Sequence, residues 1–327
     1  MNENNLIEIR DLSIEFKLHS GTIRAVDQVS LDIPKGKVTA LVGESGSGKS
    51  TLASAILNIV SSPGIIKNGS ILFNGEDIVQ YSANRLRQYC WTDVSMVFQA
   101  AQNALNPVMR IGDQMIETVL AHKKMRKEEI IKKASQLLDY VRLEPSRVLK
   151  AYPHELSGGM KQRVMIAFSL LLDPKLVILD EPTTALDVIT QDYIFDILLK
   201  VHKEMNITML LLSHDISVVA KVADRIGVMY AGKIVETGET FEMFENTKHP
   251  YTAGLIQAAP SLLDDVSKNK SIRGSSPNLL NLPPGCAFHP RCEFATDRCK
   301  QEQPRGISVG KGRIAACHLN EKGEMLA

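Results

Sequence analysis

The feature that most constrains this chain is a glycine-rich string placed between an apolar run and a helical stretch. Gly43-Glu-Ser-Gly-Ser-Gly-Lys-Ser-Thr51 directly follows Val38-Thr-Ala-Leu-Val. This string is the complete pattern of a phosphate-binding loop, which requires a buried strand before it and a helix after it. The context therefore predicts an α/β fold with a phosphate site at this strand-to-helix turn.

The residue types of the loop suit a nucleoside triphosphate bound with Mg²⁺. Glycines let backbone N–H groups turn onto phosphate oxygens at the start of a helix. We expect the Lys49 ammonium at the β and γ phosphates and the Ser50 hydroxyl on Mg²⁺. The predicted ATP-binding residues of the loop are Gly43, Ser45, Gly46, Gly48, Lys49, Ser50 and Thr51.

A second string supplies two adjacent carboxylates at the end of an apolar run. Leu176-Val-Ile-Leu precedes Asp180 and Glu181. By itself, an Asp-Glu pair is more often a solvated strand end, but the phosphate loop reverses that preference. We expect Asp180 to serve Mg²⁺ and Glu181 to act as the general base that orients the attacking water.

Composition excludes several other classes of protein. The chain has 327 residues, of which 44% are apolar, so it can bury a substantial core. Its net charge of +1 gives no general attraction to nucleic acid. The first residues lack the features of a signal peptide, and no apolar run approaches the roughly 20 residues needed to span a bilayer. We therefore expect a cytosolic chain that makes no nucleic-acid contacts.

Hydrophobic patterning predicts the remaining architecture. Leu6–Phe16, Ala25–Ile33 and Ser70–Phe73 are predicted strands, the last between Asn68-Gly and Asn74-Gly turns. Residues 110–172 follow a helical pattern, and Ile207–Leu212 has the apolar character of a strand buried on both faces. The expected fold is an α/β core with an antiparallel β subdomain and a helical insert over about residues 100–172.

A third string identifies the family that the chain resembles. Leu156-Ser-Gly-Gly-Met-Lys-Gln-Arg163 can open a helix with Ser157 as its N-cap, which is itself an anion site. The string resembles the signature of the ABC ATPases and lies between the phosphate loop and the Asp-Glu strand, as theirs does. The signature residues are Ser157, Gly158, Gly159 and Met160, where methionine replaces the commonest residue, glutamine.

Other ABC elements match in order along the chain. Gln99 resembles the Q-loop glutamine, which implies a Mg²⁺ ligand, and Asp187 resembles the D-loop aspartate. His214 resembles the switch histidine, which implies a donor to the γ-phosphate that positions water. Phe16 lies where an adenine-stacking aromatic is expected, although it suits a strand core equally well. The resemblance implies a head-to-tail dimer in which each ATP contacts the phosphate loop of one subunit and the signature of the other.

Three further segments resemble the oligopeptide, dipeptide and nickel importer subunits: Gln102–Pro107, His249–Leu255 and Pro283–Cys292. This resemblance implies an ATPase at the cytoplasmic face of the membrane. Its partners would be a second ATPase chain, expected to be a paralogue, two transmembrane permease subunits and an extracytoplasmic substrate-binding protein. Peptides are the expected cargo, with nickel or oligosaccharides as alternatives, because the ATPase subunit does not contact the cargo.

The tail carries a group of cysteines that the ATPase motifs do not explain. In a reducing cytosol such a group indicates metal binding rather than disulfides. Four thiolates suit Zn²⁺ or a [4Fe–4S] cluster. Resemblance to tails of some peptide-importer subunits favours iron–sulfur, while His289 and His318 as substitute ligands would favour zinc. A metal-free set of buried thiols is the remaining alternative. The candidate ligands are Cys286, Cys292, Cys299 and Cys317, and Cys90 is interpreted as a packed apolar residue.

The predicted domains are an ATPase domain over residues 1–260 and a cysteine-bearing extension over 261–327. Two alternatives to a transport ATPase stay open. One is a soluble ABC-type ATPase of DNA repair or translation, although the chain lacks the long coiled-coil insert or second ATPase domain of those classes. The other is a metal- or redox-responsive regulator that hydrolyses ATP only incidentally.

Overall fold

The computed structural model describes residues 4–99, 103–183, 187–259, 272–310 and 312–321. The chain divides into two compact units, one of residues 1–79 with 211–327 and one of residues 80–210. The sequence-predicted boundary at residue 260 lies outside the described residues and stays a prediction. Within the described ranges, no helix combines the length and apolar character needed to cross a bilayer.

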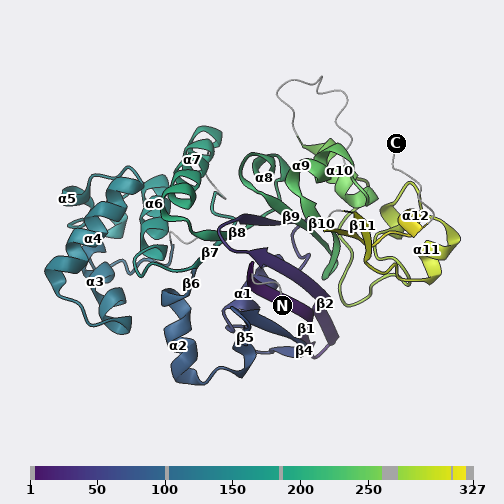
Figure 1. Cartoon of the computed structure of the whole chain (residues 1–327), viewed down its shortest axis with the longest axis horizontal. Coiled ribbons are helices and arrows are strands. Elements are labelled where there is room, and N and C mark those ends of the chain that lie inside the picture. Colours follow the sequence, from purple (N-terminus) through teal and green to yellow (C-terminus); the bar gives the residue numbers. More distant parts are fainter. Residues whose placement is uncertain (1–3, 100–102, 184–186, 260–271, 311, 322–327) are drawn as a thin grey trace. The chain divides into compact units, whose positions relative to one another are not determined.

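The first unit contains most of the strands (Figure 1). Its strands are β1 (Asn5–Leu18), β2 (Gly21–Pro34), β3 (Val38–Val42), β4 (Gly64–Phe73), β5 (Glu76–Asp77), β9 (Arg225–Tyr230), β10 (Lys233–Glu239), β11 (Ile307–Gly310) and β12 (Arg313–Ala315). Its helices are α1 (Lys49–Ile56), α8 (Ile216–Val222), α9 (Thr240–Glu245), α10 (Pro250–Ala258), α11 (Asp297–Gln301) and α12 (His318–Glu321). Strand β8 (Thr208–Ser213) begins in the second unit and ends in the first.

The predicted antiparallel subdomain is present as a sheet with strand order β2-β1-β4-β5. Its buried face changes from odd to even positions along β1, since Ile7, Ile9, Leu12 and Ile14 are all fully buried. A register shift between Ile9 and Leu12 makes this change possible, because an extra residue reverses which face the next side chains occupy.

The same irregularity corrects one sequence prediction. Asn68-Gly69 is not a turn before a short strand, because β4 runs through it from Gly64 to Phe73. Gly69 has φ +91°, and a Cβ there would lie 2.6 Å from the Asp11 carbonyl oxygen. The glycine therefore serves the bulge between β1 and β4, where a neighbouring backbone approaches closely.

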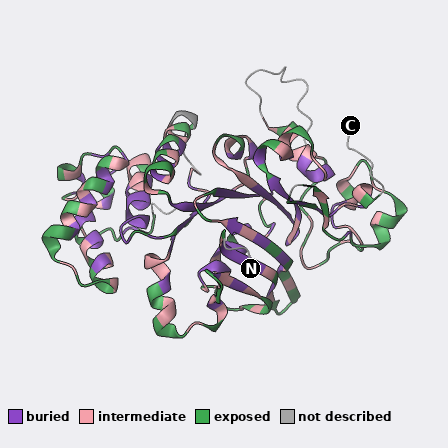
Figure 2. Cartoon of the chain, viewed as in Figure 1, coloured by how far each residue is buried: buried purple, intermediate pink, exposed green. Residues whose placement is uncertain are grey.

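The larger sheet of the first unit places the phosphate loop. Its strand order is β11-β12-β10-β9-β3, with β3 parallel to β9 and β9 antiparallel to β10. All residues of β3 are buried. Figure 2 colours the buried residues of the chain purple. An apolar strand buried on both faces typifies a parallel strand, as predicted.

The described part of the tail joins this sheet, so a separate cysteine-rich module is not confirmed. Strand β12 pairs with β10 through Glu236↔Ala315. Arg313 on β12 donates from Nη2 to Glu236 Oε1 at 2.9 Å, and the two side chains are 3% and 0% exposed. The Glu236 carboxylate also accepts the backbone N–H groups of Lys248 and His249. A buried ion pair with these extra hydrogen bonds anchors the tail.

The second unit is mainly helical and confirms the predicted helical stretch. Its elements are α2 (Ala83–Thr92), β6 (Val94–Val97), α3 (Ile111–His122), α4 (Lys127–Tyr140), α5 (Pro145–Val148), α6 (Gly158–Ser169), β7 (Leu176–Asp180) and α7 (Val188–Met205). The helical pattern predicts one buried face. Its residues Met115, Val119, Ile130, Leu137, Leu138 and Val141 are buried, whereas Ile131, expected on the same face, is half-buried. Strand β6 pairs in parallel with β7, which completes the α/β character of the fold.

Candidate nucleotide site

The phosphate loop has the predicted context, with β3 ending at Val42 and α1 beginning at Lys49. The Lys49 side chain is buried inside the loop, where its Nζ donates to the carbonyl oxygens of Gly43 at 2.6 Å and Glu44 at 3.0 Å. Ser45, Gly46 and Ser50 are exposed. The loop thus surrounds a fixed ammonium at a helix N-terminus, an arrangement suited to binding phosphate.

The second unit brings together two of the predicted catalytic residues. Gln99 Nε2 donates to Glu181 Oε2 at 3.1 Å. Glu181 follows β7 with φ +47°, a conformation that is uncommon for a residue other than glycine and often marks a functional position. Asp180 is buried at the end of the strand, one residue earlier. The predicted Mg²⁺ ligand Asp180 and the predicted base Glu181 therefore leave one strand end together.

The signature and D-loop residues lie at two neighbouring helix starts. Ser157 is the N-cap of α6, as predicted, and its Oγ accepts the Met160 N–H at 3.3 Å. Asp187 is the N-cap of α7 and accepts both the backbone N–H and the hydroxyl of Thr190. Thr190 also lies beside the signature, because a Cβ on Gly159 would be 3.3 Å from its Cγ2. Ser157 and Gly158 are exposed and Gly159 and Met160 half-buried, while Ala185 and Leu186 of the D-loop lie outside the described residues.

The two remaining predicted site residues belong to the first unit. His214 is exposed directly after β8, and the following residue, Asp215, caps α8. Phe16 is half-buried on β1, opposite Gly64 of β4. A Cβ on Gly64 would lie 2.7 Å from the Phe16 ring, so the glycine leaves space for this aromatic ring. Both the adenine-stacking and the strand-core interpretations of Phe16 stay open.

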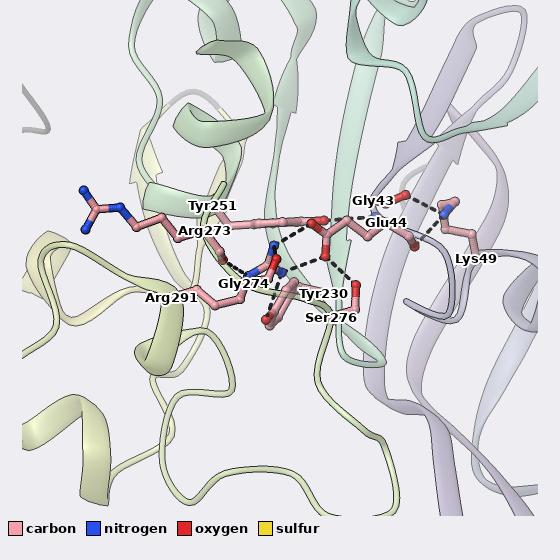
Figure 3. Close-up of polar contacts among 9 residues, drawn as sticks. All are labelled: Gly43, Glu44, Lys49, Tyr230, Tyr251, Arg273, Gly274, Ser276 and Arg291. Carbon is pink, nitrogen blue, oxygen red and sulfur yellow. Dashed lines mark hydrogen bonds and ion pairs between the residues drawn. The ribbon is translucent and has the colours of Figure 1, made fainter. Parts of the chain in front are cut away.

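Sequence reasoning did not assign a role to the Glu44 side chain or to Tyr251 and Arg291, which contact Glu44. Its backbone N–H donates to the Tyr251 hydroxyl at 2.9 Å, and its carboxylate is held by Arg291 (Figure 3). The Arg291 guanidinium lowers the pKa of Glu44, while burial raises the pKa of Tyr251. The only sequence signal was indirect, since Tyr251 and Arg291 lie within the strings that resemble peptide importers.

Helix α10, which carries Tyr251, begins at a buried histidine. His249 Nδ1 accepts the Tyr251 N–H at 3.0 Å and caps the helix. The ring is 2% exposed, and burial lowers its pKa to about 3. His249 is therefore neutral at physiological pH, with its proton on Nε2.

The four tail cysteines line one pocket. Its other lining residues include three histidines, His249, His289 and His318. The cavity volume is about 20 Å³, roughly the space of one water molecule. Burial raises the pKa of Cys292 to about 11 and of Cys317 to about 12, and the neighbouring cysteines add to both shifts. Within the described residues, no group of three or more His, Cys, Asp or Glu side chains is arranged to hold a metal ion. Cys90 is not among the residues that line this pocket and is half-buried on α2.

Comparison with protein families gives two matches in one chain. Residues 26–184 match the ABC transporter family, and residues 235–299 match the family described as oligopeptide/dipeptide transporter, C-terminal region. The first range contains the phosphate loop, the signature and the Asp-Glu pair, and the second contains Tyr251 and Arg291.

Curated relatives match over nearly the whole chain. The dipeptide transport ATP-binding protein DppD of Caldanaerobacter subterraneus is 46% identical, covering 98% of this chain and 99% of its own. The oligopeptide transport protein AppD of Bacillus subtilis is 42% identical with 98% of each chain covered, and DppD of Escherichia coli is 40% identical with 96% covered. Among solved structures, the dimeric bacterial ABC transporter cassette MJ0796 has a TM-score of 0.63 and 29% identity, covering 72% of this chain and 98% of that one.

Proposed function

Because the chain belongs to the ATP-binding subunits of ABC transporters, in the branch with the oligopeptide/dipeptide C-terminal region, we propose that it powers peptide import. It hydrolyses ATP, and this hydrolysis drives transport of dipeptides or oligopeptides. The observation that carries the proposal is the end-to-end match to dipeptide and oligopeptide transport proteins, which includes the C-terminal region as well as the ATPase motifs. Nickel and oligosaccharides are the competing cargoes.

The chemistry at the site is phosphoryl transfer to water. Lys49 and the loop N–H groups bind the β and γ phosphates, and Glu181 orients and partly deprotonates the attacking water. Gln99 holds the Glu181 carboxylate in place through its 3.1 Å hydrogen bond. His214 donates to the γ-phosphate.

The oxygen donors of the site fit Mg²⁺, which prefers hard ligands. Ser50 offers an exposed hydroxyl at the start of α1, while Asp180 and Gln99 offer a carboxylate and an amide oxygen. Ser50, Asp180 and Gln99 would hold Mg²⁺, and the ion would supply positive charge that offsets the negative charge developing on the phosphates during transfer.

The assembly follows from the exposed signature. Ser157, Gly158 and the N–H groups that begin α6 face solvent, so they are available to the nucleotide of a second ATPase subunit. The dimeric cassette among the similar structures supports this arrangement. We place the pair at the cytoplasmic face of the membrane, beneath two permease subunits fed by a substrate-binding protein. Closure on ATP and opening after hydrolysis would move the permeases as rigid bodies.

A transport assay tests the cargo. The chain, its ATPase partner and the permeases are reconstituted in vesicles with the binding protein, and uptake of labelled dipeptides, oligopeptides, Ni²⁺ and oligosaccharides is compared. We expect ATP-dependent uptake of peptide alone, and no uptake when Lys49→Ala replaces the wild type. Uptake of Ni²⁺ or sugar without peptide would overturn the peptide assignment while leaving the ATPase intact.

The four-cysteine pocket supports a second, finer proposal, that it holds a metal centre. Four cysteines line one cavity, and sulfur donors are the type that thiolate-binding metals take. Bound metal would deprotonate thiols whose pKa is otherwise raised. The family resemblance favours [4Fe–4S]. A single Zn²⁺ needs less space than a cluster, and either centre would require the lining of this cavity of about 20 Å³ to rearrange, because no group of described residues is arranged to hold a metal ion.

Metal analysis after anaerobic purification decides between a [4Fe–4S] cluster and Zn²⁺. Iron with acid-labile sulfide and a broad visible absorption band would establish the cluster, and zinc alone would establish the alternative. Cys292→Ser should lose the metal, whereas Cys90→Ser, which changes a cysteine outside the pocket, should keep it. Absence of metal from the anaerobic wild type would refute a metal centre.

A further inference from the structure

Glu44 of the phosphate loop is held by a residue that lies 247 positions away in the sequence. Arg291 donates from Nη1 to Glu44 Oε2 at 2.7 Å and from Nη2 to Oε1 at 2.8 Å. The Ser276 hydroxyl donates to the same carboxylate at 2.5 Å. Figure 3 shows that these side chains converge on the loop from the C-terminal part of the chain. Both oxygens of the Glu44 carboxylate thus accept hydrogen bonds from this part of the chain.

The main chain of Glu44 is held as well. Its N–H donates to the Tyr251 hydroxyl at 2.9 Å, and its carbonyl oxygen accepts from Lys49 Nζ at 3.0 Å. Tyr251 is fully buried and packs against Tyr230, with ring centroids 4.6 Å apart. The groups that hold Glu44 through its N–H and its carboxylate therefore come from outside the loop, while its carbonyl lies against the loop's own lysine.

The geometry of Arg291 separates this contact from an ordinary surface ion pair. Its side chain is 8% exposed, against 27% for Glu44. Nε donates to the Arg273 carbonyl at 2.7 Å, and the guanidinium lies 5.8 Å from the ring centroid of Tyr230 and 5.9 Å from that of Phe288. The guanidinium is therefore fixed before it meets Glu44, so little side-chain entropy is lost in the bidentate contact.

Fixing Glu44 matters because the loop is rich in glycine. Ordering an unrestrained residue when ligand binds has an entropic cost, and this cost is largest for glycine. Glu44 is the only residue of the Gly43–Gly48 segment with an ionic side chain. Its carbonyl also positions the ammonium of Lys49.

We propose that Arg291 is a positioning residue for ATP, which preorganises the phosphate loop through Glu44. The C-terminal extension is then part of the ATP-binding apparatus rather than an appendage. The proposal concerns ATP binding alone and holds whatever the cargo or the metal content of the cysteine pocket.

The test measures the Kd for MgATP of the full-length chain by calorimetry, in Arg291→Met, Glu44→Gln and the double variant. We expect each single variant to bind about tenfold more weakly. If Arg291 acts through Glu44, the double variant binds no more weakly than the weaker single variant. Arg291→Lys keeps the charge but loses the bidentate geometry, so its Kd for MgATP should lie between those of the wild type and Arg291→Met. In the assembled ATPase, the change should fall mainly on KM for ATP and less on kcat.

Arg298→Met is the matched control. Arg298 also directly precedes a pocket cysteine, but it pairs with Glu302 and Glu321 of the extension itself. Its removal should leave the Kd for MgATP unchanged.

Three outcomes would overturn the proposal. One is a lower melting temperature with unchanged Kd in Arg291→Met, which would reduce the pair to a structural contact. Another is multiplication of the two single effects in the double variant. The third is equal weakening in Arg298→Met. If Arg291→Met fails to fold, Arg291→Lys and Glu44→Gln take its place, since Arg291→Lys keeps a cation beside Glu44 and Glu44→Gln keeps an oxygen that can accept from the Arg291 guanidinium. An unchanged Kd for MgATP in both variants would overturn the proposal.

Discussion

Two glycines of the phosphate loop differ in one structural respect, which makes them a matched pair for mutation. Gly46 has φ +79° and Gly48 has φ +104°, so alanine is strained at both positions. A Cβ on Gly46 would meet no atom within 4 Å, whereas one on Gly48 would lie 2.2 Å from the Ala25 carbonyl oxygen and 2.8 Å from Met229 Cε. Only the second alanine has to displace the backbone.

The expected costs follow from these contacts. Gly46→Ala should lower the free energy of unfolding by about 1–2 kcal/mol, the usual cost of a left-handed conformation for an L-residue. Gly48→Ala should lower the free energy of unfolding by about 1–3 kcal/mol more, because overpacking forces the loop to move roughly 1 Å away from β2. Gly48 is also the N-cap of α1, so this retreat displaces Lys49 and should abolish ATP binding.

The assay is chemical denaturation without nucleotide, followed by MgATP binding at a temperature where both variants are folded. Comparison without nucleotide removes any contact between the new methyl groups and phosphate. Equal denaturation midpoints for Gly46→Ala and Gly48→Ala would refute the steric reasoning, because the two variants share the backbone strain and differ only in the clash.

Three further predictions concern catalysis, acid stability and the tail. Glu181→Gln should retain MgATP binding but lower single-turnover hydrolysis by about 10²–10⁴-fold, because an amide cannot act as the base although it can still accept from Gln99. Burial lowers the pKa of His249 in the native state to about 3. Below about pH 6.5 the unfolded state therefore binds a proton that the native state does not, and the free energy of unfolding falls by up to about 1.4 kcal/mol per pH unit towards pH 3. His249→Asn should flatten that part of the profile of melting temperature against pH. Arg313→Met should lower the unfolding free energy by about 3–5 kcal/mol, since it leaves the buried Glu236 carboxylate without its cation.

Each of these has a result that would contradict it. Wild-type turnover in Glu181→Gln would exclude this carboxylate as the base. An unchanged acid profile in His249→Asn would mean that other groups dominate acid unfolding. Recovery of stability in an Arg313→Met, Glu236→Gln double variant is the expected control, and its failure would show that packing rather than charge sets the cost.

Sequence reasoning succeeded where a feature depends on adjacent residues. The strand before Gly43, the helix after it and the N-cap at Ser157 are all read from short strings with local physical causes. The bulge at Gly69 was misread as a turn, because the close backbone that requires glycine belongs to another strand. The contact between Glu44 and Arg291 could not be predicted for a similar reason. A charge pair between residues so far apart in the chain produces no periodic pattern in the sequence.

The anchoring of the tail through Arg313 changes what a minimal ATPase would be. A chain shortened at residue 259 would keep the phosphate loop, the signature, Glu181 and His214. It would also lose Arg291 and Ser276, and it would leave the fully buried Glu236 carboxylate unpaired. Nucleotide affinity measured on such a fragment would describe a loosened phosphate loop, so the catalytic motifs alone do not define the smallest working enzyme.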